Sequence, residues 1–63
     1  MAHEILRYFG YAHLPEALQE VAEPLYELAV QLDIKLPDGA EKSAGLRKLL
    51  EAKDCFVRSQ LNN

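Results

Sequence analysis

The chain is poor in the residues that usually supply chemistry or covalent stability to a small protein. It has 63 residues, with one cysteine, two histidines, three glycines and no tryptophan. A single cysteine excludes an intrachain disulfide, and it is typical of a reducing cytoplasm. No apolar run approaches the ~20 residues that a membrane span needs, so we expect no membrane partner. The scattered glycines form no phosphate-binding loop, and the histidines lack the spacing of a zinc site.

Catalysis is not predicted, and neither a cofactor nor a metal is expected. The serines have no histidine or carboxylate partner at a suggestive distance along the chain, and nucleophile–base constellations are absent. A core of this size rarely contributes more than about 3–5 kcal/mol. Because an intrachain disulfide is excluded and a metal is not expected, self-association is the remaining way to supplement it.

Charge is distributed unevenly along the chain. Residues 1–34 carry six acids and one base, and residues 35–63 carry six bases and four acids, which gives −5 and +2 and a total of −3. An acidic total argues against binding of bulk nucleic acid, which depends on many phosphate contacts. It leaves room for a small anion held by a few cations, or for two helices with complementary faces.

The apolar pattern predicts an all-α fold, with a single domain over residues 1–63. We expect a short N-terminal helix at about 2–9, ended by Gly10, and a helix at about 15–33 interrupted at Pro24, which either kinks this helix or splits it in two. After a turn with Pro37 and Gly39, a last helix should run over about 39–60. The long helices form an antiparallel hairpin that assembles into a homo-oligomer. Leucines and a valine recur every three or four residues and predict the packing stripe of the first long helix: Leu14, Leu18, Val21, Leu25, Leu28 and Leu32.

The last helix places a lysine where a core residue is expected. On a helical wheel Lys53 falls in the middle of the apolar stripe, and Lys42 falls on the same side. A cation there is costly unless it pairs with an acid or binds an anion. Both alternatives stay open from the sequence. A second side of this helix carries small residues (Ala44, Ala52, Cys55 and Ser59), which would let another helix approach closely.

Three of the five aromatic residues lie together, at Tyr8, Phe9 and Tyr11, just before His13. Aromatic rings beside cations can stack on a nucleobase while the cations hold phosphate. The alternative is that these rings simply cover one end of the hairpin.

Two blocks of the sequence resemble a known family. The first block is Gly10-Tyr11-Ala12-His13-Leu14-Pro15. The second consists of Glu41-Lys42-Ser43, Leu46-Arg47-Lys48-Leu49-Leu50-Glu51-Ala52-Lys53-Asp54 and Val57-Arg58. Both are similar to the hairpin domain of small bacteriophage anti-CBASS and anti-Thoeris sponges. The resemblance covers roughly residues 8–58, and the second block is the more specific one.

The resemblance implies a protein that binds and sequesters a cyclic di- or trinucleotide, or a cyclic ADP-ribose-type signal, in the cytoplasm of an infected bacterial host. It also implies a hexamer with ligand pockets between protomers. Tyr11 would stack on a base, and phosphate contacts would come from Lys42, Ser43, Arg47 and Lys53. Phe9 and His13 complete the candidate ligand-binding residues. The first long helix carries Tyr26 among acids near the position where better-known members have a lysine, so this chain differs there. The alternative function is a small oligomeric helical module that binds a host or phage protein.

Overall fold

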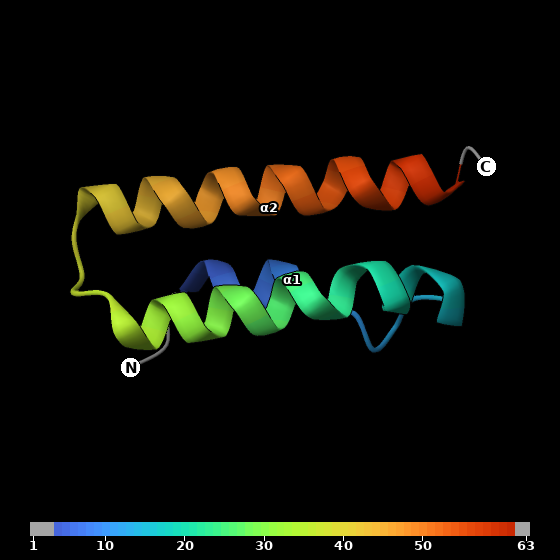
Figure 1. The fold of residues 1–63 in the computed structure, drawn as a ribbon, viewed down its shortest axis with the longest axis horizontal. Helices are drawn as coiled ribbons and strands as arrows, with labels where there is room; N and C mark the ends of the chain where they lie inside the picture. Colours follow the sequence, from blue (N-terminus) through green and yellow to red (C-terminus); the bar gives the residue numbers. More distant parts are fainter. Residues whose placement is uncertain (1–3, 62–63) are drawn as a thin grey trace.

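The computed structural model describes residues 4–61, which form three helical elements and no strand. A 3₁₀ helix, η1, spans Glu4–Phe9, and two α-helices follow, α1 over Glu16–Lys35 and α2 over Ala40–Leu61. Figure 1 shows α2 running back alongside α1, with η1 behind them. The all-α prediction is therefore confirmed. Residues 2 and 3 of the expected first helix lie outside the described part.

Two prolines explain where α1 begins and ends. The carbonyl of Pro15 accepts the first bonds of α1, from the N–H groups of Leu18 and Gln19 at 2.9 and 3.0 Å. At the other end Leu36 is extended, with φ −100° and ψ 144°. A residue before proline is disfavoured in the helical region, and Pro37 follows Leu36 directly. The turn is therefore short, and α2 begins at Ala40 within one residue of the expected position.

Pro24 lies inside α1 and does not interrupt it. Of the two predicted outcomes, a kink or a split, the split does not occur, because α1 continues through Pro24, which is exposed. There water can hydrate the Glu20 carbonyl that has lost its helical donor, so the missing bond is tolerated.

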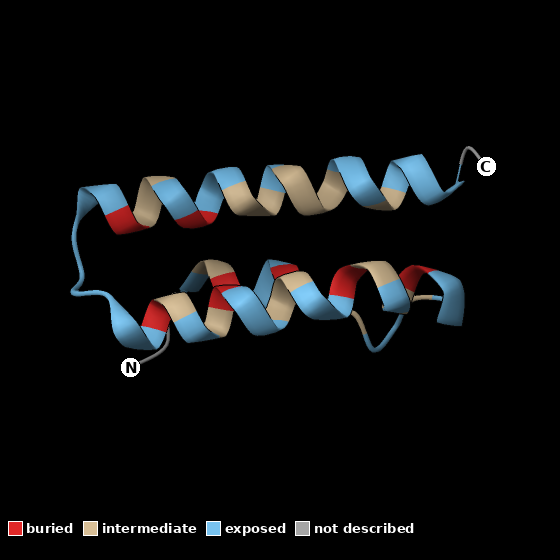
Figure 2. Ribbon diagram, in the orientation of Figure 1, coloured by how far each residue is buried: buried red, intermediate tan, exposed pale blue. Residues whose placement is uncertain are grey.

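The core lies between η1 and the two long helices. Its buried residues are Leu6, Phe9, Ala29 and Leu46, and Phe9 is the one large side chain with no exposed surface among residues 4–61. Figure 2 shows that buried positions are few and that they concentrate where the elements meet. The six-residue η1 thus supplies the largest core residue, and it closes one side of the hairpin.

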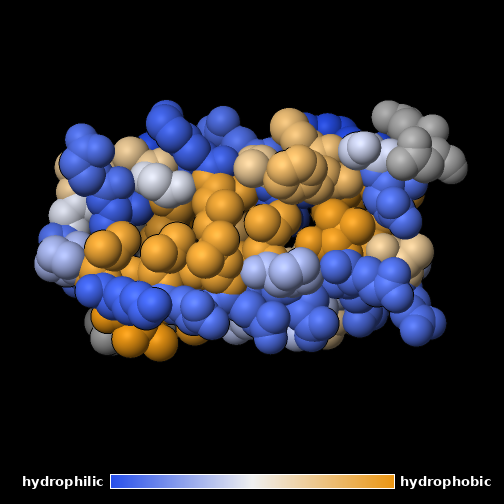
Figure 3. Space-filling model, viewed as in Figure 1, coloured by the Kyte–Doolittle hydropathy of each residue, from blue (hydrophilic) through white to orange (hydrophobic). Residues whose placement is uncertain are grey.

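The buried stripe of α1 differs from the predicted one. Its buried residues are Leu18, Ala22, Ala29 and Asp33, whereas Leu28 of the predicted stripe is 42% exposed. Because Ala22 and Ala29 have small side chains, neighbouring elements can pack closely against their side of α1. The leucines of the predicted stripe therefore lie to one side of this close contact. On the side of the hairpin opposite η1, Figure 3 shows a continuous apolar surface.

Candidate functional site

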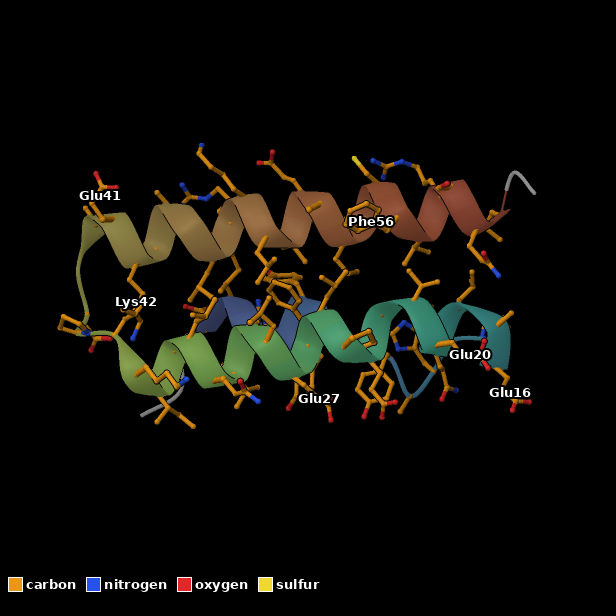
Figure 4. All side chains as sticks on the ribbon, viewed as in Figure 1. Glu16, Glu20, Glu27, Glu41, Lys42 and Phe56 are labelled. Atoms are coloured by element: carbon orange, nitrogen blue, oxygen red, sulfur yellow. The ribbon has the colours of Figure 1, made fainter. Side chains whose placement is uncertain are left out.

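Lys42 is buried at the turn of the hairpin and holds the two helices together. Its side chain is 5% exposed, and its ammonium nitrogen lies 2.9 Å from Asp33 Oδ1 and 2.7 Å from Asp38 Oδ1. It also donates hydrogen bonds to the carbonyl oxygens of Asp33 and Leu36, at 2.9 and 3.3 Å. Figure 4 shows the side chain of Lys42 directed from α2 toward the end of α1. Backbone oxygens at a helix C-terminus carry partial negative charge, so the ammonium is well placed there.

The electrostatics of this cluster are those of a structural ion pair. The hydrogen bonds that Lys42 donates to the carboxylates of Asp38 and Asp33 raise the pKa of Lys42 above its usual value. The same hydrogen bond from Lys42 lowers the pKa of Asp38. Four oxygens already surround the ammonium, so a phosphate would have to compete with two carboxylates to reach it. Asp33 was not anticipated as part of this cluster. Two features of the sequence could have indicated it. Asp33 lies four residues after Ala29 on the buried stripe, and it lies near the end of a helix that leads into a short loop.

Lys53 lies on the inward side of α2, as its position on the apolar stripe predicts. Its side chain is 12% exposed, and its ammonium lies 2.9 Å from Asp54 Oδ1. The lysine therefore places its aliphatic part among apolar neighbours and keeps its charge next to an acid.

The candidate aromatic residues are separated from one another by the fold. Phe9 is fully buried in the core, so its ring is not accessible to a ligand in this chain. Tyr11 donates a hydrogen bond to Glu23 Oε2 at 3.0 Å, and its ring meets the edge of Tyr26 with centroids 5.6 Å apart. The hydrogen bond to Glu23 raises the pKa of Tyr11. His13 is exposed in the turn at residues 12–13.

The segment that carries Tyr11 is fixed to α1 by Gln19. The side-chain amide of Gln19 donates to the carbonyl oxygens of Leu14 and Ala12, at 2.7 and 3.4 Å. In Figure 1 the segment from η1 to α1 lies toward the end of the hairpin away from the turn. Tyr11 is therefore not brought together with the first turns of α2 within one chain.

Ser43 and Arg47 form the most accessible polar pair of the candidate set. They are four residues apart on α2, so they share one side of the helix near its N-terminus. Ser43 is half-buried, and its N–H donates to the Gly39 carbonyl at 3.1 Å. Arg47 and its neighbour Lys48 are exposed, and neither forms an ion pair within residues 4–61. At this place on α2 an exposed cation that an anion can reach from solvent lies one helical turn from Ser43.

Metal binding and membrane insertion find no support in the described part of the chain. Residues 4–61 contain no group of three or more histidine, cysteine, aspartate or glutamate side chains arranged to hold a metal ion. Neither long helix combines the length and the apolar character that crossing a membrane requires. Comparison with known proteins gives no matching family model, no matching curated protein and no matching solved structure.

Proposed function

We propose that this protein binds and sequesters a cyclic oligonucleotide or cyclic ADP-ribose-type signal, and so blocks a bacterial anti-phage defence. The observation that carries the proposal is Arg47. It is an exposed cation without an acidic partner in residues 4–61, one turn from Ser43, in the segment with the family resemblance. The N-terminal part of α2 also favours an anion through the helix dipole.

Binding of this kind needs more than one protomer. Tyr11 lies away from the first turns of α2 in the same chain (Figure 1). A base that stacks on Tyr11 while its phosphate contacts Arg47 would therefore bridge two copies. Two-fold or higher symmetry would repeat the same few residues around the ligand, so a small acidic protein can bind a compact polyanion. In this proposal Lys42 acts indirectly, by fixing the start of α2 against α1.

The test is calorimetric titration, guided by a thermal-shift screen, of cyclic di- and trinucleotides and cyclic ADP-ribose isomers. A ligand that binds only the folded protein raises its thermal midpoint. Replacing Arg47 removes hydrogen bonds to a charged group, which are worth about 1.5–3 kcal/mol each, so Arg47→Ala should weaken binding at least about tenfold.

Arg58→Ala is the matched control, because it removes the same charge near the other end of α2. Equal affinities of wild type and Arg47→Ala would contradict the assigned role of Arg47. A flat response to every compound would contradict the sponge function. It would favour the alternative, an oligomeric helical module that binds a host or phage protein through its apolar surface.

A further inference from the structure

One side of the hairpin is apolar and uncovered by any element of residues 4–61. We call this surface the open face and define it by residues that helical spacing places on one side of α1 and α2: Leu25, Leu28, Leu32, Leu36, Gly45, Leu49, Ala52 and Phe56. Leu49 forms its inner edge, because it also packs against the core. Leu28, Leu36 and Phe56 are 42%, 46% and 53% exposed. Figure 3 views this side, and Figure 4 shows Phe56 on the same side of α2. Apolar surface of this extent is typical of an interaction site.

A hollow in the open face has a glycine in its wall. It is lined by Leu32, Leu36, Leu46 and Leu49 together with Gly45, Glu41 and Lys42, and its volume is about 270 Å³. A Cβ atom added to Gly45 would meet nothing within 4 Å, and Gly45 has no positive φ. Glycine inside a helix costs about 1 kcal/mol relative to alanine. Neither the backbone nor the packing of this chain explains that cost, whereas close approach of a second molecule does.

The accessible surface of the chain is consistent with a partner that covers the open face. It amounts to 4591 Å², about 500 Å² more than the roughly 4,100 Å² of a compact monomer of 7.1 kDa. That excess approaches the roughly 600 Å² that the smaller standard interfaces bury on each partner.

We propose that the open face packs against the same face of a second copy, with each α2 antiparallel to the partner's α2. Three small residues recur every seven positions on this side of α2, at Gly45, Ala52 and Ser59. Centring the pair on Ala52 places Gly45 opposite the partner's Ser59. The partner's Phe56 then lies in the hollow beside Gly45, between Leu49 and Ala52, as a knob in a hole.

Sedimentation over a concentration series tests the pairing. The inference does not depend on the ligand, because Arg47 lies outside the open face. The wild-type chain should associate, and Phe56→Glu should weaken association at least about tenfold, as expected for an aromatic residue at the centre of an interface. Ile34→Glu is the matched control, since Ile34 is 78% exposed beside a hollow that Leu6 of η1 also lines. A wild-type chain that remains folded and monomeric at its solubility limit overturns the proposal, as does equal weakening by both variants.

The variant Gly45→Ala tests whether weaker association comes from blocking the close approach of the partner or from a loss of folding. Alanine is the better helix former, so the variant should raise the thermal midpoint in a Phe56→Glu background, where pairing is already weakened. In the wild-type background it should weaken association, because the methyl group occupies part of the hollow. Unchanged or tighter association of Gly45→Ala overturns the assignment of the hollow.

Crosslinking tests the antiparallel register. In a Cys55→Ser background, Ala52→Cys should form a disulfide-linked pair readily, because the two Ala52 positions face each other across the two-fold axis. Glu51→Cys, its exposed neighbour, should not. Equal crosslinking of the two variants, or of neither, overturns the register.

Discussion

The two sides of the hairpin carry similar apolar side chains but differ in what covers them. On one side η1 covers the helices and brings Phe9 into a position with no exposed surface. On the other side Phe56 is 53% exposed, and no element of residues 4–61 covers it. The comparison teaches that a phenylalanine in this chain is a core residue only where the chain itself supplies a cover. The apolar surface on the other side is the one that we propose a second copy covers.

The largest expected effect comes from removing the covered phenylalanine. Phe9→Ala leaves a cavity in the core and should cost about 3–5 kcal/mol, which is close to the whole stability of a domain of this size. Circular dichroism should show a largely unfolded chain. Phe56→Ala should keep its helical signal under the same conditions at low concentration. Equal loss of helix in both variants would remove the distinction between the two sides.

An intermediate effect is expected from the buried ion pair at the turn. Asp33→Ala removes one partner and leaves an uncompensated buried charge, which costs about 3 kcal/mol in such pairs. Asp38 remains beside Lys42 and reduces the loss. The double variant Asp33→Leu with Lys42→Met should recover stability in urea unfolding, since it removes both charges together. A double variant less stable than Asp33→Ala would mean that the turn requires the charges themselves.

The smallest expected effect is a dependence of stability on acid. The pKa of Asp38 is lowered in the folded chain by Lys42, so its contribution is present above its unfolded pKa of about 3.8. That contribution should disappear as the pH falls through the folded pKa, which lies below 3.8. Thermal midpoints of the wild type and Asp38→Asn should therefore converge on acidification from pH 5 toward pH 2. A constant difference over that range would contradict the assignment.

The sequence predicts the number and positions of the long helices, because the spacing of apolar residues and the prolines near the helix ends indicate them directly. It predicts less well which side of α1 is buried. Leucine spacing alone does not reveal that Ala22 and Ala29 permit close packing, and the stripe is rotated for that reason. Lys53 was placed correctly on the inward side, because helical geometry decides that position.

The candidate site is harder to predict, since partners come from different elements. Lys42 and Asp33 are nine residues apart across the turn, so their ion pair can be predicted only when the length of the turn is known. Whether Phe9 faces the core or solvent depends equally on where η1 docks. The accessibility of Arg47, in contrast, follows from its place on the outer side of α2.

The docking of η1 has a consequence for folding during synthesis. Leu6 and Phe9 leave the ribosome early, but the core that they join includes Leu46 of α2. These side chains therefore stay exposed until Leu46 has been synthesised and α2 can pack. A nascent chain that stops short of α2 carries Leu6 and Phe9 in solvent, where a chaperone can reach them.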